Sequence, residues 1–270
     1  MLGYRHAFHA GNHADVLKHV ALAATLARLV EKPRPLLYLE THAGAGRYDL
    51  ASEQARKTGE AASGVERIWQ AQDAPAAVAR YLKCIHAENR DGELRWYPGS
   101  PAIAARLLRG EDRMALYELH PDDCARLGAA PPAHRRVQIE QSDGLAGLRA
   151  RLPPLERRAL VMIDPSYELD RDYQDVPRAL EDALKRFATG VYLLWYPVLA
   201  GAPVERMLRA VERAAPGSPL RIQLEPRAAG SARGLTGGGV LVINPPWKLD
   251  RDLADAVDWL RPRLAAQGTP

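Results

Sequence analysis

The sequence has little cysteine and no long apolar run, and each shortage excludes a class of protein. Cys84 and Cys124 are the only cysteines in 270 residues, which excludes a disulfide framework and a cysteine-based metal site. The most apolar stretch, residues 16–30, is interrupted by charged side chains, so no run reaches the roughly 18–20 residues that a membrane helix needs. The N-terminus has no apolar core of the kind that signal peptides carry. We therefore expect a cytoplasmic protein that does not enter a membrane.

Charge is nearly balanced along the chain. The 37 lysine and arginine residues exceed the 33 aspartate and glutamate residues by four, and the isoelectric point is about 9.1. This small excess is compatible with a polyanionic partner but does not establish one. Arginine outnumbers lysine, which suits phosphate contacts but is equally expected from a GC-rich genome. Composition therefore leaves nucleic-acid binding open.

Short β-rich runs alternate with helical segments. Strands are predicted over residues 36–39, 115–119, 137–139, 160–163, 191–196, 220–224 and 240–243. Helices are predicted over residues 15–30, 101–109, 122–127, 145–152, 176–187 and 204–214. This alternation predicts one α/β domain over residues 1–270, with a mainly parallel seven-stranded sheet covered on both faces. The last two strands are close in sequence, which leaves room for an antiparallel edge strand.

One gap interrupts the alternation. Almost seventy residues separate Gly46 from the next predicted strand, and they are helix-prone with glycine and proline between the helical pieces. We interpret residues 48–97 as an inserted helical subdomain on the ligand side of the sheet. The basic residues around it could contact phosphates or simply form a solvated face, which is the commoner case: Arg47, Arg56, Lys57, Arg67, Arg80 and Lys83.

The first predicted strand runs into the glycine-rich sequence LLYLETHAGAGRY, residues 36–48. Ligands of parallel sheets bind outside the carboxyl ends of the strands, where glycine lets the backbone approach them closely. The third glycine of the NAD fingerprint and the lysine of a triphosphate-binding loop are both missing. The spacing Glu40-x-His42-x-Gly44-x-Gly46 instead resembles the Glu/Asp-x-Gly-x-Gly-x-Gly loop of S-adenosylmethionine-dependent methyltransferases, with His42 in place of the first glycine.

Acidic residues follow the next two predicted strands. Glu118 can accept hydrogen bonds from both ribose hydroxyls of a nucleoside cofactor. Asp143 can accept one from an adenine amine, and Gly144 leaves the backbone room beside it. Each acid alone could be a helix cap, since Asp143 precedes a predicted helix. Ligand-type residues at three consecutive strand ends favour a cofactor site.

The fourth predicted strand ends in LVMIDPSY, residues 160–167. This strand should lie beside the first, where the strand order reverses, so Asp164 should face the cofactor crevice. A carboxylate there can accept one N–H of an exocyclic adenine amine and take its proton. The Pro165 carbonyl can accept the second N–H, and Tyr167 can stack on the base. These groups meet the requirements for methylating a purine amine.

A second motif of this kind occurs downstream. The sequence VLVINPPWK places Asn244 in an Asn-Pro-Pro-aromatic motif. It follows the last predicted strand, which should belong to an edge pair away from the glycine loop. We therefore assign the catalytic role to Asp164.

Together the motifs resemble one family. Asp164-Pro165-Ser166-Tyr167 resembles the Asp-Pro-Pro-Tyr motif of adenine-N6 methyltransferases. The blocks YRHAFHAGNHADVLKH, THAGAGRY, YPGSP, ELHP and DG extend the resemblance over essentially the whole chain, to the bacterial ribosomal RNA large-subunit methyltransferase J family. That family methylates N6 of an adenosine in 23S rRNA. Ser166 replaces the second proline of the motif and should loosen the turn, which bears on catalytic efficiency more than on reaction type.

The resemblance implies a Rossmann-like class I methyltransferase fold with an inserted helical subdomain. It implies S-adenosylmethionine as methyl donor, S-adenosylhomocysteine as product, and a cap over the active site formed by residues 1–30. The positions that match cofactor contacts are His19, His42, Gly44, Ser100, Glu118, Asp143, Gly144 and Asp164. The positions that match acceptor-base or catalytic residues are Tyr4, His6, Lys18, Asp164, Pro165 and Tyr167.

We therefore expect methylation of an adenosine N6 in 23S rRNA, free or partly assembled, by a monomer. No metal is expected, because the histidines near the N-terminus fit no standard zinc spacing. The same chemistry on DNA is an alternative, although no target-recognition domain is evident. A non-catalytic nucleic-acid-binding protein in DNA uptake or use is another, but it would not need the cofactor loop.

Overall fold

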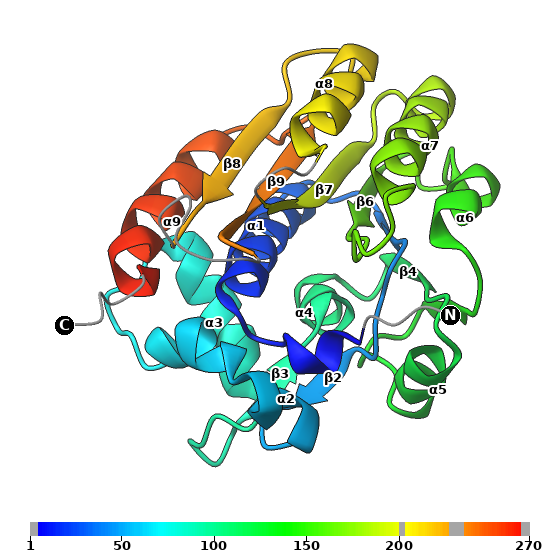
Figure 1. Ribbon diagram of the computed structural model, residues 1–270. Coiled ribbons are helices and arrows are strands. Elements are labelled where there is room, and N and C mark those ends of the chain that lie inside the picture. The colour runs from blue at the N-terminus through cyan, green and yellow to red at the C-terminus, as the bar shows by residue number, and fades with distance from the viewer. Residues whose placement is uncertain (1–4, 200–202, 227–234, 266–270) are drawn as a thin grey trace.

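A seven-stranded sheet runs through the centre of the protein, seen in a computed structural model that describes residues 5–199, 203–226 and 235–265 (Figure 1). Its strands are β1 (Leu37–Glu40), β4 (Arg113–Tyr117), β5 (Val137–Glu140), β6 (Ala159–Ile163), β7 (Val191–Val198), β8 (Leu220–Leu224) and β9 (Gly237–Ile243). They lie in the order β5-β4-β1-β6-β7-β9-β8. All seven predicted strands are confirmed.

The sequence left room for an antiparallel strand at the edge of the sheet. In the structure the antiparallel strand is β9, which lies second from the edge, between β7 and β8. It pairs antiparallel with both β7 and β8, while the other neighbouring strands pair in parallel. Every residue of β9 is buried, whereas β8 alternates apolar residues with Arg221 and Gln223. A strand with one polar face suits the edge, and a strand that is apolar throughout suits the interior.

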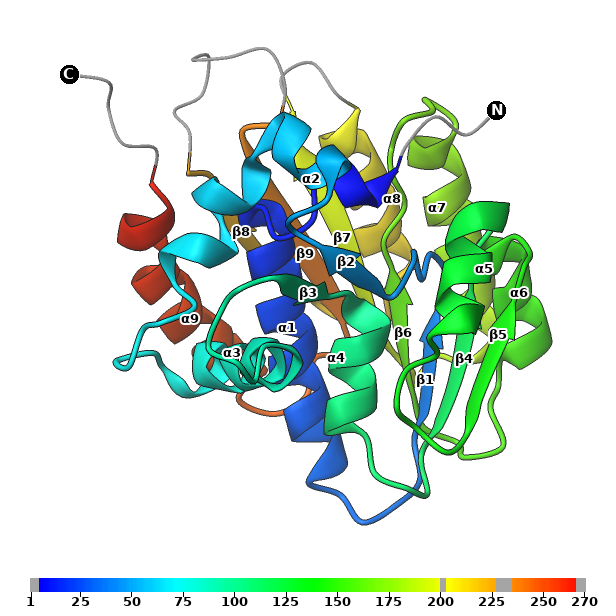
Figure 2. The same cartoon turned by 90° about the horizontal axis from the view of Figure 1, so that it is seen from below.

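Helices cover both faces of the sheet. Helix α1 (His13–Val30) packs on one face with α4 (Ser100–Leu107) and α9 (Leu249–Leu264), and α6 (Gly144–Arg151), α7 (Asp172–Arg186) and α8 (Val204–Ala214) cover the other (Figure 2). Tyr38 packs in the core beside α1, whereas Leu37 and Leu39 pack in the core beside α7. This two-sided burial explains why the strands read as continuous apolar runs.

Several helix bounds differ from the sequence prediction. Helix α7 begins four residues before the predicted range. Helix α1 begins two residues before its predicted range, at His13, where the Asn12 side chain accepts a hydrogen bond from the Asp15 amide and caps the helix. Helix α9 was not predicted, although its buried residues recur at helical spacing. No helix in the described ranges is long and apolar enough to cross a membrane.

The stretch interpreted as an insertion begins and ends in a separate two-stranded ribbon. Strands β2 (Arg47–Asp49) and β3 (Trp96–Pro98) pair antiparallel. Between them lie α2 (Glu53–Thr58), the 3-10 turns η2 (Glu60–Ser63) and η3 (Val65–Arg67), and α3 (Ala76–Glu88). Helix α3 packs on α1 and α9, so the stretch shares the core of the sheet domain.

The N-terminal segment lies against this stretch. The 3-10 turn η1 (His6–Phe8) precedes α1, and the Thr58 hydroxyl at the end of α2 donates to the Phe8 carbonyl. His9 and Asn12 contact the Glu60 carboxylate at 2.9 Å each. These contacts hold the segment before α1 in place beside α2 (Figure 2).

One further helix completes the described elements. Helix α5 (Pro121–Ala129) follows β4 and packs against β5.

The order of strands β1, β4 and β6 determines where a ligand site can form. Strand β1 pairs in parallel with β4 on one side and with β6 on the other. The strand order therefore reverses between β1 and β6, and a crevice forms where the carboxyl ends of these strands diverge.

Candidate active site

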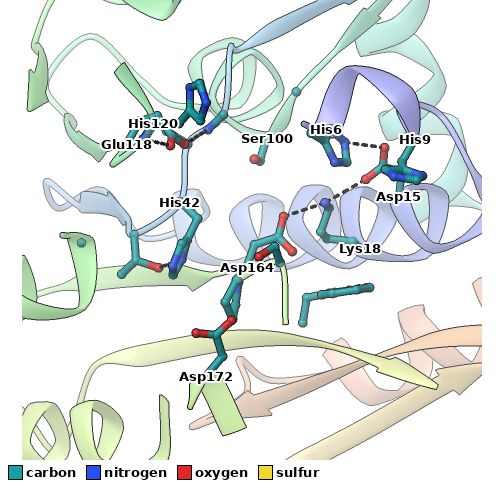
Figure 3. Close-up of a pocket in the computed structure, with 18 of the residues that line it drawn as sticks. His6, His9, Asp15, Lys18, His42, Ser100, Glu118, His120, Asp164 and Asp172 are labelled. Carbon is teal, nitrogen blue, oxygen red and sulfur yellow. Dashed lines mark hydrogen bonds and ion pairs between the residues drawn. The ribbon is translucent and has the colours of Figure 1, made fainter. Parts of the chain in front are cut away.

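A cavity of about 660 Å³ lies at the carboxyl ends of the central strands, between the sheet and the N-terminal segment (Figure 3). Cavities of this size hold cofactor-sized ligands. Most of the predicted site residues line it: His6, Lys18, His19, His42, Gly44, Ser100, Glu118, Asp143, Gly144, Asp164 and Pro165. Tyr167 is not among the lining residues, and Tyr4 lies outside the described residues.

The glycine loop after β1 is held by Glu118, which follows β4. One carboxylate oxygen of Glu118 accepts from the Gly44 amide at 2.7 Å, and the other accepts from the His120 amide at 2.7 Å. Gly44 has φ +61°, and a Cβ there would lie 2.3 Å from the Tyr48 hydroxyl. A carboxylate has about four acceptor sites, so Glu118 can also accept hydroxyl donors from the cavity.

Glu40, the last residue of β1, is fully buried below this loop. The Tyr38 hydroxyl donates to its carboxyl at 2.8 Å, and the Ser100 hydroxyl donates to the other oxygen. Burial raises the pKa of Glu40 to about 8, so the group carries a proton at neutral pH. Ser100 therefore joins the start of α4 to the end of β1 as well as lining the cavity.

Replacing Glu40 with Gln should change how stability depends on pH. The folded protein keeps the proton on Glu40 up to about pH 8, whereas the unfolded chain releases it near the ordinary pKa of 4.5. The stability that this group contributes is therefore greatest at acidic pH and is lost as pH rises towards 8. Glutamine keeps one acceptor oxygen, places an N–H donor where the second oxygen was, and never ionises. The melting temperature of Glu40→Gln minus that of wild type should therefore increase by roughly 2–6 °C as the pH is raised from about 5.5 to about 8.5. A difference that stays constant across this range contradicts the assignment.

Two histidines line the cofactor side of the cavity as neutral groups. Burial, followed by the charge of Lys18, lowers the pKa of His19 to about 3, and its Nδ1 lies 2.8 Å from the Tyr97 hydroxyl. Burial also lowers the pKa of His42, whose Nδ1 lies 2.7 Å from the Thr41 hydroxyl. Each ring therefore offers hydrogen bonds without a charge.

Asp143 caps a helix, which is one of the two roles that the sequence left open, and it also lines the cavity. Its Oδ1 accepts from the Leu145 and Ala146 amides and caps α6. The same residue is exposed and lines the cavity, so Oδ2 is left for a ligand amine. Gly144 lies directly beside the glycine loop, because a Cβ there would come 2.1 Å from the Thr41 carbonyl oxygen.

An ion-paired group lies at the centre of the cavity, on the side of α1. Lys18 Nζ donates to Asp164 Oδ2 at 2.6 Å and lies 2.8 Å from Asp15 Oδ1 (Figure 3). Burial lowers the pKa of Lys18, but the two carboxylates outweigh it and raise the pKa above its usual value. Asp15 was interpreted from sequence only as part of a helix start. Its position three residues before Lys18, on one helix face, was the available signal.

Tyr167 supports the cavity wall from behind. Its φ is +53°, its ring is 7% exposed, and the ring packs between Tyr173 and Trp195 at centroid distances of 4.9 and 5.8 Å. Its hydroxyl donates to the Trp195 carbonyl at 2.9 Å. Trp195 and Pro197, near the end of β7, line the cavity. Trp195 and Tyr48 therefore supply the tryptophan and tyrosine surface of the described cavity wall, and the sequence analysis selected neither as a site residue.

Asn244 lies at the opposite end of the sheet from Asp164. It follows antiparallel β9, and its side-chain amide donates to the carbonyls of Ala188 and Gly190, which precede β7. The Asn-Pro-Pro motif that begins at Asn244 therefore links the end of β9 to the residues before β7. Gly44 and Asp164, in contrast, line the same cavity.

The strand order, the glycine loop after β1 and the acidic residues after β4 and β6 define a class I S-adenosylmethionine-dependent methyltransferase. The family model described as "Ribosomal RNA large subunit methyltransferase D, RlmJ" matches residues 33–269, and the chain belongs to this family.

Individual relatives agree with this assignment. The chain is 47% identical over 269 residues to ribosomal RNA large subunit methyltransferase J of Escherichia coli (strain K12), covering 100% of this chain and 96% of the relative. It is 45% identical to the protein of the same name from Haemophilus influenzae, with the same coverage. Among solved structures, protein LPL1258 from Legionella pneumophila superposes with a TM-score of 0.89 at 37% identity, covering 95% of this chain and 94% of that chain.

Proposed function

We propose that the protein transfers a methyl group from S-adenosylmethionine to N6 of an adenosine in 23S ribosomal RNA. The observation that carries the proposal is the placement of Asp164 and the Pro165 backbone in the same cavity as the glycine loop. The names of the two relatives support large-subunit rRNA as the substrate. We also infer a cytoplasmic monomer that acts on free or partly assembled rRNA, with residues 48–97 as an inserted subdomain and residues 1–30 as a cap.

The residues of the cofactor side fit S-adenosylmethionine. Glycines at positions 44 and 144 let the loop after β1 pack closely against Tyr48 and the start of α6 at the edge of the cavity, because a Cβ at either position would collide with protein atoms. Eight carboxylates line the described cavity against Lys18 and Arg171, and this excess of negative charge favours a cationic ligand. We assign the ribose hydroxyls to Glu118 and the adenine amine to Asp143. When bound, the cofactor supplies an electrophilic methyl group on a sulfonium sulfur.

The acceptor side fits a purine amine. The lone pair of such an amine is delocalised into the ring, so its nitrogen must lose planarity before it attacks. Asp164 can accept one N–H and take the proton, and the Pro165 carbonyl can accept the other N–H. Lys18 has three N–H donors, of which Asp15 and Asp164 occupy two, so the third can reach a ligand. His6 lines the same side, and Tyr4 remains a predicted base contact.

Trp195 should supply the stacking surface for the acceptor base, with Tyr167 behind it. Base–aromatic stacking contributes about 1–3 kcal/mol per base. Trp195→Ala should therefore raise KM for rRNA by roughly 5- to 100-fold and leave the Kd for S-adenosylhomocysteine unchanged. Methyl incorporation at varied rRNA concentration measures the first, and calorimetry measures the second. The matched control is Trp247→Ala, because Trp247 is 84% exposed and follows β9, away from the cavity. Equal KM values for the two variants would refute the assignment.

Mass mapping of the methylated nucleoside tests the function itself. 23S rRNA transcripts, partly assembled subunits and duplex DNA are incubated with the protein and methyl donor, digested and analysed. We expect N6-methyladenosine in rRNA and not in duplex DNA. Methylation of DNA alone would overturn the RNA substrate, and a methylated cytosine or guanine would overturn the adenine-N6 chemistry.

A further inference from the structure

Asp15 lies between the N-terminal segment and the ion-paired group in the cavity. Its side chain is 2% exposed. Oδ2 accepts from the Gly11 amide at 2.9 Å and lies 2.9 Å from His6 Nε2, while Oδ1 lies 2.8 Å from Lys18 Nζ (Figure 3). The Asp15 amide is itself bound to the Asn12 side chain at 2.8 Å. Both carboxylate oxygens are therefore engaged, and the group is fixed at the start of α1.

The surroundings of Asp15 strongly favour its ionised form. Burial alone would raise the pKa of Asp15, but the charges of His6 and Lys18 outweigh it and hold the pKa well below its usual value. Lys18, itself only 4% exposed, contacts one oxygen of Asp15 and one of Asp164. Its ammonium group is thus shared between two carboxylates, and the three side chains together carry a net charge of −1.

Removing the charge of Asp15 would change the state of Asp164. Lys18 would then pair with Asp164 alone, and an unshared ammonium at 2.6 Å favours the ionised carboxylate and lowers its affinity for a proton. The carboxylate that should accept the N6 proton would become a weaker base. Lys18 would also lose the contact that fixes its position on the cavity side of α1.

We propose that Asp15 is a positioning residue for methyl transfer, which shares the charge of Lys18 and so keeps Asp164 able to accept a proton. The inference rests on the proposed function of Asp164. Asp15 also joins His6 to α1, so a purely structural role in holding the N-terminal segment is the competing explanation. The two explanations differ in whether the effect of Asp15 depends on Lys18.

A double-mutant cycle with Asp15→Asn, Lys18→Met and the double variant separates them. Asparagine keeps the size of the side chain and one acceptor oxygen. We expect Asp15→Asn to lower kcat by roughly 10- to 100-fold, with KM for rRNA and Kd for S-adenosylhomocysteine within about threefold. In the Lys18→Met background the same substitution should change kcat by less than about threefold. Rates are expressed per cofactor site counted by calorimetry, so that unfolded protein does not contribute.

Asp252→Asn is the matched control. Asp252 lies on α9 and accepts two hydrogen bonds from Arg28, each at an N–O distance of 2.7 Å. Arg28 lies on α1, the helix that also carries Asp15, and Asp252 does not line the cavity. It should lower the melting temperature and leave kcat per site unchanged. A wild-type kcat in Asp15→Asn, or an equal loss in both Lys18 backgrounds, overturns the proposal. The cycle measures the number of methyl groups transferred to rRNA, whichever nucleoside carries them. Digestion of the same RNA identifies that nucleoside. Failure of the proposed function can therefore be told apart from failure of the role proposed for Asp15.

Discussion

Asp164→Asn is expected to lower the rate of methyl transfer to rRNA by roughly 10³-fold, within the range that general acid–base groups contribute. Asparagine keeps the shape of the side chain and its acceptor oxygen but cannot take the proton that N6 must lose. Lys18 would also lose one of its two carboxylate partners. Single-turnover incorporation of labelled methyl groups into 23S rRNA measures the effect, with saturating methyl donor.

The cofactor side should be largely unaffected by this change. Asparagine keeps an acceptor oxygen for the cofactor contact that the family resemblance implies at position 164. Glu118, Asp143 and the glycine loop hold their contacts independently of Asp164, so the Kd for S-adenosylhomocysteine should change by less than about threefold. Asp170→Asn is the control, since Asp170 is exposed, occurs six residues later in the same loop and does not line the cavity. A variant at position 164 that keeps a rate near wild type would remove the carboxylate from the mechanism.

The sheet and the positions of the site residues could be predicted because both follow from strand ends. Strands buried on two faces read as apolar runs, so the runs ending near Leu39 and Ile163 were recognisable. The carboxyl ends of parallel strands share one edge, which places Glu40, Glu118 and Asp164 close together once the order is known. The Asn-Pro-Pro motif was set aside because it follows a strand expected in an edge pair away from the glycine loop. In the structure that strand, β9, is antiparallel and places Asn244 at the opposite end of the sheet.

The orientation of the aromatic rings could not be predicted in this way. Tyr167 has a positive φ, a backbone state that the sequence Asp-Pro-Ser-Tyr does not reveal, and that state helps to determine where its ring points. Trp195 was missed because an aromatic residue within a strand is usually core. The pairing of β6 with β7 brings Trp195 into the cavity that Asp164 also lines.

Asp15 was missed for a related reason. Locally it reads as an acid in the first turn of a helix, and the structure shows that it has that position. Its second set of contacts depends on Lys18 reaching Asp164 across 146 residues of sequence. Such a tertiary contact has no periodic signature, so only coordinates bring the three side chains together.

The second large effect is expected from adding one methyl group at Gly144. A Cβ at this position would lie 2.1, 2.5 and 2.6 Å from the carbonyl oxygen, Cα and carbonyl carbon of Thr41. All three are backbone atoms of the loop after β1, so no side-chain rotation relieves the contact. Gly144→Ala must displace either that loop or the start of α6. We expect a stability loss of about 1–3 kcal/mol and a Kd for S-adenosylhomocysteine raised by roughly 30-fold or more.

The matched control for Gly144→Ala is Gly128→Ala in the neighbouring helix α5. Gly128 has no atom within 4 Å of a built Cβ, and alanine in a helix interior is favoured over glycine by roughly 0.5–1 kcal/mol. Thermal melting and calorimetry should therefore show Gly128→Ala at or above wild-type stability with unchanged affinity. If Gly144→Ala bound S-adenosylhomocysteine as tightly as wild type, the contact between α6 and the glycine loop would not shape the cofactor site. If the close approach of the α6 backbone to the glycine loop shapes the cofactor site, Gly144→Ala should lose affinity for S-adenosylhomocysteine and Gly128→Ala should not.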